Sequence, residues 1–154
     1  MTPRFDIGTL APGIYTAMGA LERFLHDCGL EPALVHLVKL RASQVNGCAY
    51  CLDMHWKDLR ALGETEQRLY SLDAWRECPY YTPRERAALA WTEAVTLVAT
   101  AQVPDAVYDE VRAEFHGAEL ANLTLAIATI NAWNRLAIAG RAVPGTYQPA
   151  AVHV

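Results

Sequence analysis

The chain has 154 residues, the length of one ordinary domain, and its hydrophobic share of 53% rules out intrinsic disorder. Its net charge of −4 excludes a basic field that would attract nucleic acid or anionic lipid. Only 19% of its residues are charged, which suggests that some apolar surface is covered between subunits. We therefore expect one domain over residues 1–154 that forms a homo-oligomer and binds neither nucleic acid nor membrane.

Two segments bear on where the protein resides. The most apolar stretch, residues 120–139, is interrupted by three asparagines and Arg135, so it is too polar for a membrane span. The first residues contain no charged stretch followed by an apolar one, so we expect no secretory signal. Both features predict a cytoplasmic protein.

The composition favours helices throughout. Alanine and leucine far outnumber valine and isoleucine, and no window alternates apolar and polar residues for long enough to predict a strand. Glycine, proline and an Asn-Gly break divide the chain into about six to seven helices of a compact all-α bundle. The first four are expected at about 14–28, 32–46, 48–62 and 64–72. A fifth begins at a Thr82–Glu85 capping box, a sixth runs from Pro104 to about 117, and a seventh covers about 118–139. An aromatic stretch over 73–81 and the tail after Gly140 are expected to be irregular.

The chemistry is concentrated in the segment CAYCLDMH, residues 48–55. Its two cysteines follow the helix break and should lie in the first turn of a helix, where partial positive charge stabilises a thiolate. Cys51 and His55 are one turn apart on one face, so the imidazole can accept the thiol proton. The helix dipole alone favours Cys48. Because a specific base both moves the proton and compensates the charge, we expect Cys51 to attack and Cys48 to resolve.

This arrangement predicts peroxide reduction without a metal or an organic cofactor. A Cys51 thiolate attacks the O–O bond and becomes sulfenic acid, Cys48 condenses with it to a disulfide, and an external dithiol reduces that disulfide. Two alternatives stay open. The same pair suits a thiol–disulfide oxidoreductase or redox sensor with little peroxidase turnover. A zinc-binding or structural helical module could instead use Cys48, Cys51 and His55 as ligands, with His36 as a fourth.

The asparagines of the last helix are a separate feature. Asn131, Asn134 and Arg135 lie in an otherwise apolar helix, and buried polar groups must be hydrogen-bonded. We expect them to form an intersubunit or interhelix polar network.

The run LVKLRASQVNGCAYCLDMH, residues 37–55, resembles the carboxymuconolactone decarboxylase superfamily in its alkylhydroperoxidase D (AhpD)-like branch. Stretches at 63–70, 85–94 and 131–136 support the resemblance, which covers about residues 14–140. It implies an all-α fold, trimers or hexamers, and a thiol peroxidase site. In that site Cys51 attacks peroxide, Cys48 resolves, and His55 belongs to a proton relay. The decarboxylase branch does not use this cysteine pair, so we do not expect decarboxylation.

Two residues depart from the AhpD pattern. The chain has His36 where the well-studied enzymes have a glutamate, twelve residues before the first cysteine, and Tyr50 where they have a histidine. A glutamate would orient and charge-stabilise the motif histidine, whereas His36 accepts a hydrogen bond only when neutral. We expect His36 to lie beside His55 and the peroxidase activity to be tuned differently.

Overall fold

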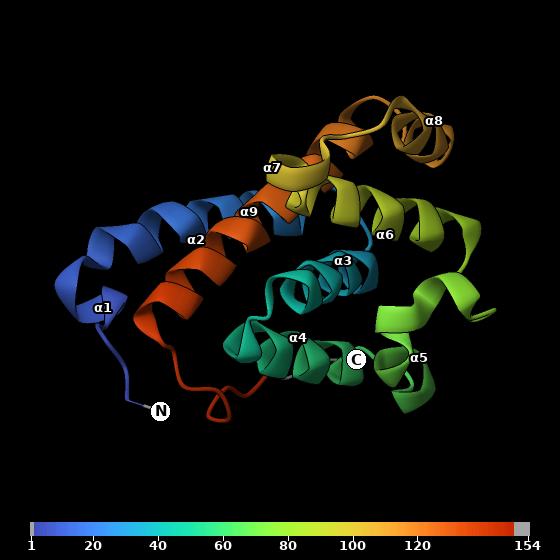
Figure 1. Cartoon of the computed structure of the whole chain (residues 1–154). Helices are drawn as coiled ribbons and strands as arrows, with labels where there is room; N and C mark the ends of the chain where they lie inside the picture. Colours follow the sequence, from blue (N-terminus) through green and yellow to red (C-terminus); the bar gives the residue numbers. More distant parts are fainter. Residues whose placement is uncertain (1, 150–154) are drawn as a thin grey trace.

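The computed structural model describes residues 2–149, and within this range every regular element is helical. The prediction of an all-α fold is confirmed (Figure 1). In chain order the elements are α1 (Ile7–Leu10), α2 (Pro12–Asp27), α3 (Pro32–Asn46), α4 (Ala49–Ala61), α5 (Glu66–Tyr70), the 3₁₀ helix η1 (Leu72–Glu77), α6 (Pro83–Thr96), α7 (Val98–Ala101), α8 (Asp105–Glu114) and α9 (Ala118–Gly140). In this part of the chain no helix is both long enough and apolar enough to cross a membrane.

The expected count of six to seven helices is wrong, because residues 2–149 form ten. The additional elements are short: α1 and α7 have four residues each, and η1 has six. A segment of one turn has no room for a helical repeat of apolar residues, so periodicity does not reveal it. The stretch expected to be irregular, 73–81, contains most of η1.

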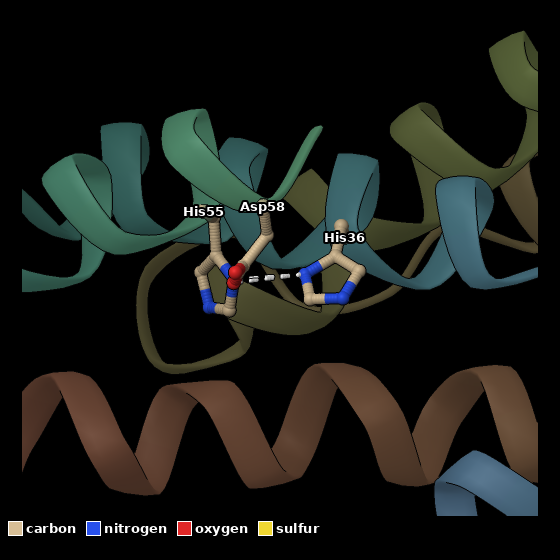
Figure 2. A group of neighbouring side chains, drawn as sticks. All are labelled: His36, His55 and Asp58. Atoms are coloured by element: carbon tan, nitrogen blue, oxygen red, sulfur yellow. Dashed lines mark hydrogen bonds and ion pairs between the residues drawn. The ribbon is translucent and has the colours of Figure 1, made fainter. Parts of the chain in front are cut away.

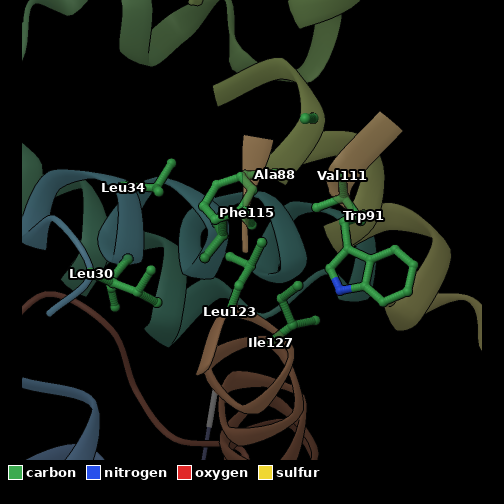
Figure 3. Close-up of a cluster of buried hydrophobic side chains, with 11 residues drawn as sticks. Leu30, Leu34, Ala88, Trp91, Val111, Phe115, Leu123 and Ile127 are labelled. Carbon is green, nitrogen blue, oxygen red and sulfur yellow. The ribbon is translucent and has the colours of Figure 1, made fainter. Parts of the chain in front are cut away.

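Helix α3 lies at the centre of the structure and packs against α4, α6 and α9. Eight of its fifteen residues are buried, more than one amphipathic face supplies. The long helix α9 packs against α2, α3, α4 and α6, as its nearly continuous apolar sequence predicts. Where α3, α6, α8 and α9 converge, buried side chains form the cluster drawn in Figure 3: Leu30, Leu34, Val35, Val38, Ala87, Ala88, Trp91, Val111, Phe115, Leu123 and Ile127.

Two of the predicted helix boundaries, the start of α6 and the end of α3, are confirmed in detail. The Thr82 hydroxyl accepts a hydrogen bond from the Glu85 amide and caps α6, and the Glu85 carboxylate accepts one from the Thr82 amide. Gly47 ends α3 with a φ of 69°, a left-handed conformation that glycine adopts without strain. This turn places Cys48 at the N-cap of α4 and Cys51 in its first turn.

The asparagines of α9 form an interhelix network, as expected. Asn46, at the end of α3, donates from Nδ2 to the Oδ1 atoms of Asn131 at 3.0 Å and Asn134 at 2.8 Å. Asn134 in turn donates to the Ser43 hydroxyl at 3.1 Å. These bonds fix the C-terminal end of α3, directly before the cysteines, against the middle of α9.

Candidate functional site

The two cysteines of the motif are close enough to form a bond. The Sγ atoms of Cys48 and Cys51 lie 2.8 Å apart, and both residues are free thiols. Both are almost fully buried, together with Ala42 of α3 and Ile130 of α9. Since an S–S bond is about 2.05 Å long, a small approach of the sulfurs would close a disulfide.

The contact between the sulfurs makes their acidities unequal. The pKa of Cys48 is lowered to about 7, mainly by the hydrogen bond with the Cys51 side chain. Burial opposes this lowering, whereas the amides of Cys51 and Tyr50 and the side chain of Asn134 add to it. The same contact with Cys48, together with burial, raises the pKa of Cys51. The pair therefore loses one proton near neutral pH, and the sulfur at the helix N-cap holds most of the charge.

A cavity of about 590 Å³ lies beside the pair. Cys51 is among its lining residues and Cys48 is not, so only the second cysteine faces this space. Much of the wall is apolar: it includes Phe5, Tyr15, Met54, Trp133 and Leu136. The Arg4 amide donates to the Gly140 carbonyl at 2.9 Å, which holds the N-terminal segment against the end of α9 at the rim.

The predicted histidines meet at the same cavity. His36 of α3 and His55 of α4 both line it, and their Nδ1 atoms are 3.2 Å apart. No hydrogen bond joins His55 to either thiol. The Nε2 atom of His55 is buried and has no hydrogen-bond partner within residues 2–149. The expected action of His55 on Cys51 therefore stays a prediction, while the expected neighbourhood of His36 and His55 is confirmed.

Sequence reasoning missed Asp58, which completes the cluster shown in Figure 2. Its Oδ2 atom lies 3.4 Å from Nδ1 of His36 and 3.5 Å from Nδ1 of His55. Its other oxygen, Oδ1, accepts a hydrogen bond from the Tyr147 hydroxyl at 2.7 Å. The available signal was the spacing, because a residue three positions after His55 on a helix lies on the same face.

Burial dominates the ionisation of the two imidazoles. It is the main cause that lowers the pKa of His36 to about 4, and the neighbouring His55 adds to the effect. Burial likewise lowers the pKa of His55, against the opposing influence of Asp58. Although burial raises the pKa of Asp58, the nearby His55 ring and the hydrogen bond from Tyr147 outweigh it and hold the pKa low. At neutral pH the cluster contains two neutral rings and one carboxylate.

A second polar group lies on the wall of the cavity. Glu22 of α2 pairs with the Lys39 ammonium and accepts a hydrogen bond from the Trp133 indole at 3.0 Å. Lys39 is only 4% exposed, so its charge is balanced inside the protein by Glu22. In the sequence, the sign that could have revealed this ion pair was Lys39, the single lysine of the largely apolar helix α3.

Comparison with known proteins gives consistent results. The model of the carboxymuconolactone decarboxylase family matches residues 12–94. The uncharacterised protein YdfG of Bacillus subtilis is 42% identical over 139 residues, which cover 90% of this chain and 95% of that protein. The uncharacterised protein YnjA of Escherichia coli is 30% identical over 114 residues, or 74% of this chain and 61% of that protein.

A solved structure extends the similarity to the whole fold. ATU0492 of Agrobacterium tumefaciens, a protein of unknown function proposed to be the antioxidant defence protein AhpD, superposes with a TM-score of 0.91 at 41% identity. The match covers 95% of this chain and 100% of that one. The protein described here is a member of the carboxymuconolactone decarboxylase family, with the AhpD-like fold.

Proposed function

We propose that this protein is a thiol-dependent peroxidase that reduces hydroperoxides with the Cys48–Cys51 pair. One observation carries the proposal: two free thiols lie 2.8 Å apart, and one of them faces a largely apolar cavity of about 590 Å³. A cavity of this size accommodates an organic hydroperoxide. The substrate class is therefore an alkyl or lipid-derived hydroperoxide, and the reductant is an external dithiol.

The two cysteines have different roles in this reaction. Cys48, the more acidic thiol, holds the charge in the resting pair, and the proton of Cys51 passes to it along the S···S contact. The Cys51 thiolate attacks the outer oxygen of the hydroperoxide, the O–O bond breaks, and the alkoxide leaves as an alcohol after taking one proton. Cys48 then attacks the Cys51 sulfenic acid, and water leaves as the disulfide forms. Overall, two thiols and one hydroperoxide give one disulfide, one alcohol and one water.

The histidines would serve the proton transfers. His55 lines the cavity and has a buried Nε2 atom free of hydrogen bonds in residues 2–149, so it can take a proton from the thiol pair and return it to the leaving oxygen. His36 and Asp58 contact Nδ1 of His55 and would position the ring. Assembly into trimers or hexamers, which the family resemblance implies, belongs to the same proposal.

The test is a single-turnover reaction of pre-reduced protein with cumene hydroperoxide, followed by stopped flow with free thiols counted before and after. We expect four free thiols to fall to two as one equivalent of peroxide is consumed. Cys51→Ser should abolish this reaction, and Cys48→Ser should leave a trappable sulfenic acid on Cys51. Cys78→Ser, at a half-buried thiol outside the cavity lining, is the matched control and should leave the rate unchanged.

Two results would count against the proposal. Thiols that stay unchanged over minutes with excess hydroperoxide would exclude peroxidase activity. If those thiols still exchange rapidly with a small disulfide, the oxidoreductase or sensor alternative takes its place. Loss of the first oxidation in Cys48→Ser would instead reverse the assigned roles of the two cysteines.

A further inference from the structure

The side chains of His36, His55 and Asp58 converge on one point of the cavity wall. They come from two helices, α3 and α4, and each presents one ligand atom to the other two (Figure 2). The three separations are 3.2 Å between the Nδ1 atoms, 3.4 Å from His36 to Asp58 Oδ2, and 3.5 Å from His55 to the same oxygen. The three atoms thus form a nearly equilateral triangle.

Hydrogen bonding accounts poorly for this triangle. A charge-assisted N–H···O bond measures about 2.7–2.9 Å, so both distances to Asp58 are long for such a bond. A neutral imidazole carries one N–H, so two facing Nδ1 atoms form at most one hydrogen bond between them. A single hydrogen bond between the rings, at 3.2 Å, does not by itself place the Asp58 oxygen within 3.5 Å of both Nδ1 atoms.

The dimensions fit the face of a tetrahedral metal site. With metal–ligand distances of about 2.0–2.1 Å, the ligands of a tetrahedral zinc ion are separated by about 3.3–3.4 Å, whereas neighbouring ligands in an octahedron at the same bond lengths are about 2.9 Å apart. The observed separations match the tetrahedron. Two histidines and one carboxylate are also the three protein ligands of many zinc sites that keep a fourth position open.

We propose that His36, His55 and Asp58 bind one zinc ion through Nδ1, Nδ1 and Oδ2, with the fourth position directed into the cavity that all three residues line. The ligand set differs from the one considered from sequence, because the cysteines are not part of it. The structure instead joins the two histidines with a carboxylate from the same helix as His55.

The surroundings of the three atoms favour a divalent cation. Asp58 contributes one negative charge, and the nearby Lys39 charge is balanced by Glu22. The Tyr147 hydroxyl occupies Oδ1 of Asp58 at 2.7 Å, which orients the carboxylate and leaves Oδ2 facing the imidazoles. Such outer hydrogen bonds to metal-binding carboxylates are a regular part of zinc sites.

Zinc binding has a consequence for the proposed peroxidase, and this consequence alone rests on the proposed function. A His55 ring that binds zinc through Nδ1 keeps its proton on Nε2, so it can donate a proton there but not accept one. Zinc would therefore suppress the role of His55 as a base, and chelation would restore it.

The experiment measures metal binding directly, with no peroxide present. Cobalt(II) is titrated into the metal-free full-length protein under reducing conditions and its visible absorption recorded, and zinc is then added in competition with a chromogenic chelator. We expect one cobalt per chain, intense tetrahedral d–d absorption, no sulfur-to-cobalt charge-transfer band, and displacement by zinc. The Cys48→Ser/Cys51→Ser double variant should give the same spectrum and affinity.

Substitutions of the ligands separate this site from incidental binding. Asp58→Asn and His36→Asn should each weaken zinc binding at least tenfold, and Tyr147→Phe should weaken it about 10- to 100-fold through the lost outer hydrogen bond. Asp109→Asn is the control, because Asp109 is a surface carboxylate of α8 that pairs with Arg112 and contacts neither the triangle nor the segment that carries Tyr147. It should bind as the parent does, and circular dichroism verifies that each variant is folded.

Three outcomes would overturn the inference: no saturable cobalt or zinc binding, binding unchanged in both Asp58→Asn and His36→Asn, or binding that disappears in the double cysteine variant. A protein that binds zinc through the triangle but does not reduce peroxide would refute the proposed function alone. A peroxidase that binds no zinc would refute this inference alone.

Discussion

Asn134 is one of the groups that lower the pKa of Cys48, and its replacement tests the account of the thiol pair. The residue is fully buried in α9, donates to Ser43, accepts from Asn46, and helps to lower the pKa of Cys48 to about 7. Leucine has a similar volume but offers no hydrogen bond. In Asn134→Leu the thiolate therefore loses a neutral donor while the packing stays nearly filled.

The expected shift follows from the energy of that hydrogen bond. A hydrogen bond to a charged group contributes about 1.5–3 kcal/mol, which corresponds to roughly 1–2 pKa units. Because Cys51 and not Asn134 is the main cause of the low pKa, we expect the lower end of this range, a rise of the pKa of the pair from about 7 to roughly 8. At pH 7 the thiolate fraction would fall from about one half to roughly 9%, so the alkylation rate should drop about fivefold.

The assay is the rate of iodoacetamide alkylation as a function of pH, with thiolate absorbance in the ultraviolet as a second measure. In the parent protein the rate should rise with pH through a midpoint near 7, because the thiolate and not the thiol reacts. Asn131→Leu is the matched control, since Asn131 belongs to the same network through Asn46 and Thr96 but does not affect the thiol pKa. An unchanged midpoint in folded Asn134→Leu, or an equal shift in Asn131→Leu, would refute the reasoning.

Three further predictions concern stability and are measured by urea denaturation. Leu123→Ala, at a fully buried position of the cluster in Figure 3, should lower the free energy of unfolding by about 2–5 kcal/mol. Leu10→Ala, at a 72%-exposed position, should change it by less than about 0.5 kcal/mol. Similar values for both variants would contradict the assigned core. Thr82→Ala should cost about 1 kcal/mol by removing the α6 cap, and Thr82→Ser should restore most of it. Gly47→Ala should lower the free energy of unfolding by about 1–2 kcal/mol, because Gly47 has a φ of 69°. An unchanged free energy of unfolding would show that the turn before Cys48 relaxes to accept the side chain.

Helices with strong boundary signals could be predicted from sequence, and those without could not. Pro32 and Asn46-Gly47 delimit α3 at the predicted residues, and the Thr82 capping box begins α6 as expected. The first expected helix, about 14–28, corresponds to α2, which begins at Pro12; a proline at the first helical position was not read as a start. The single-turn helices α1 and α7 contain too few residues for a periodic pattern.

The candidate site was predictable where its members are close in sequence. Cys48, Cys51 and His55 were recognised because their spacing within one helix fixes their geometry. Tyr147 lies 89 residues after Asp58 in an irregular segment, and no local pattern reports such a contact. The orientation of His55 Nδ1 toward His36 and Asp58, rather than toward a thiol, also depends on the packing of α3 on α4, which sequence spacing does not define.

The histidine at position 36 has a physical explanation once Asp58 is taken into account. A glutamate at this position of α3 would supply the negative charge that stabilises a protonated His55, and His36 cannot supply it. Asp58 supplies that charge from α4, one turn after His55, with Oδ2 3.5 Å from its Nδ1 atom. In the proposed proton relay, the carboxylate beside His55 thus comes from its own helix, and position 36 carries a neutral ring. A ring and a carboxylate form a proton relay, but two neutral rings and a carboxylate also form a set of metal ligands. In the proposed zinc site His36 is the third ligand beside the Asp58–His55 pair, and His36→Asn should weaken zinc binding at least tenfold while leaving that pair in place.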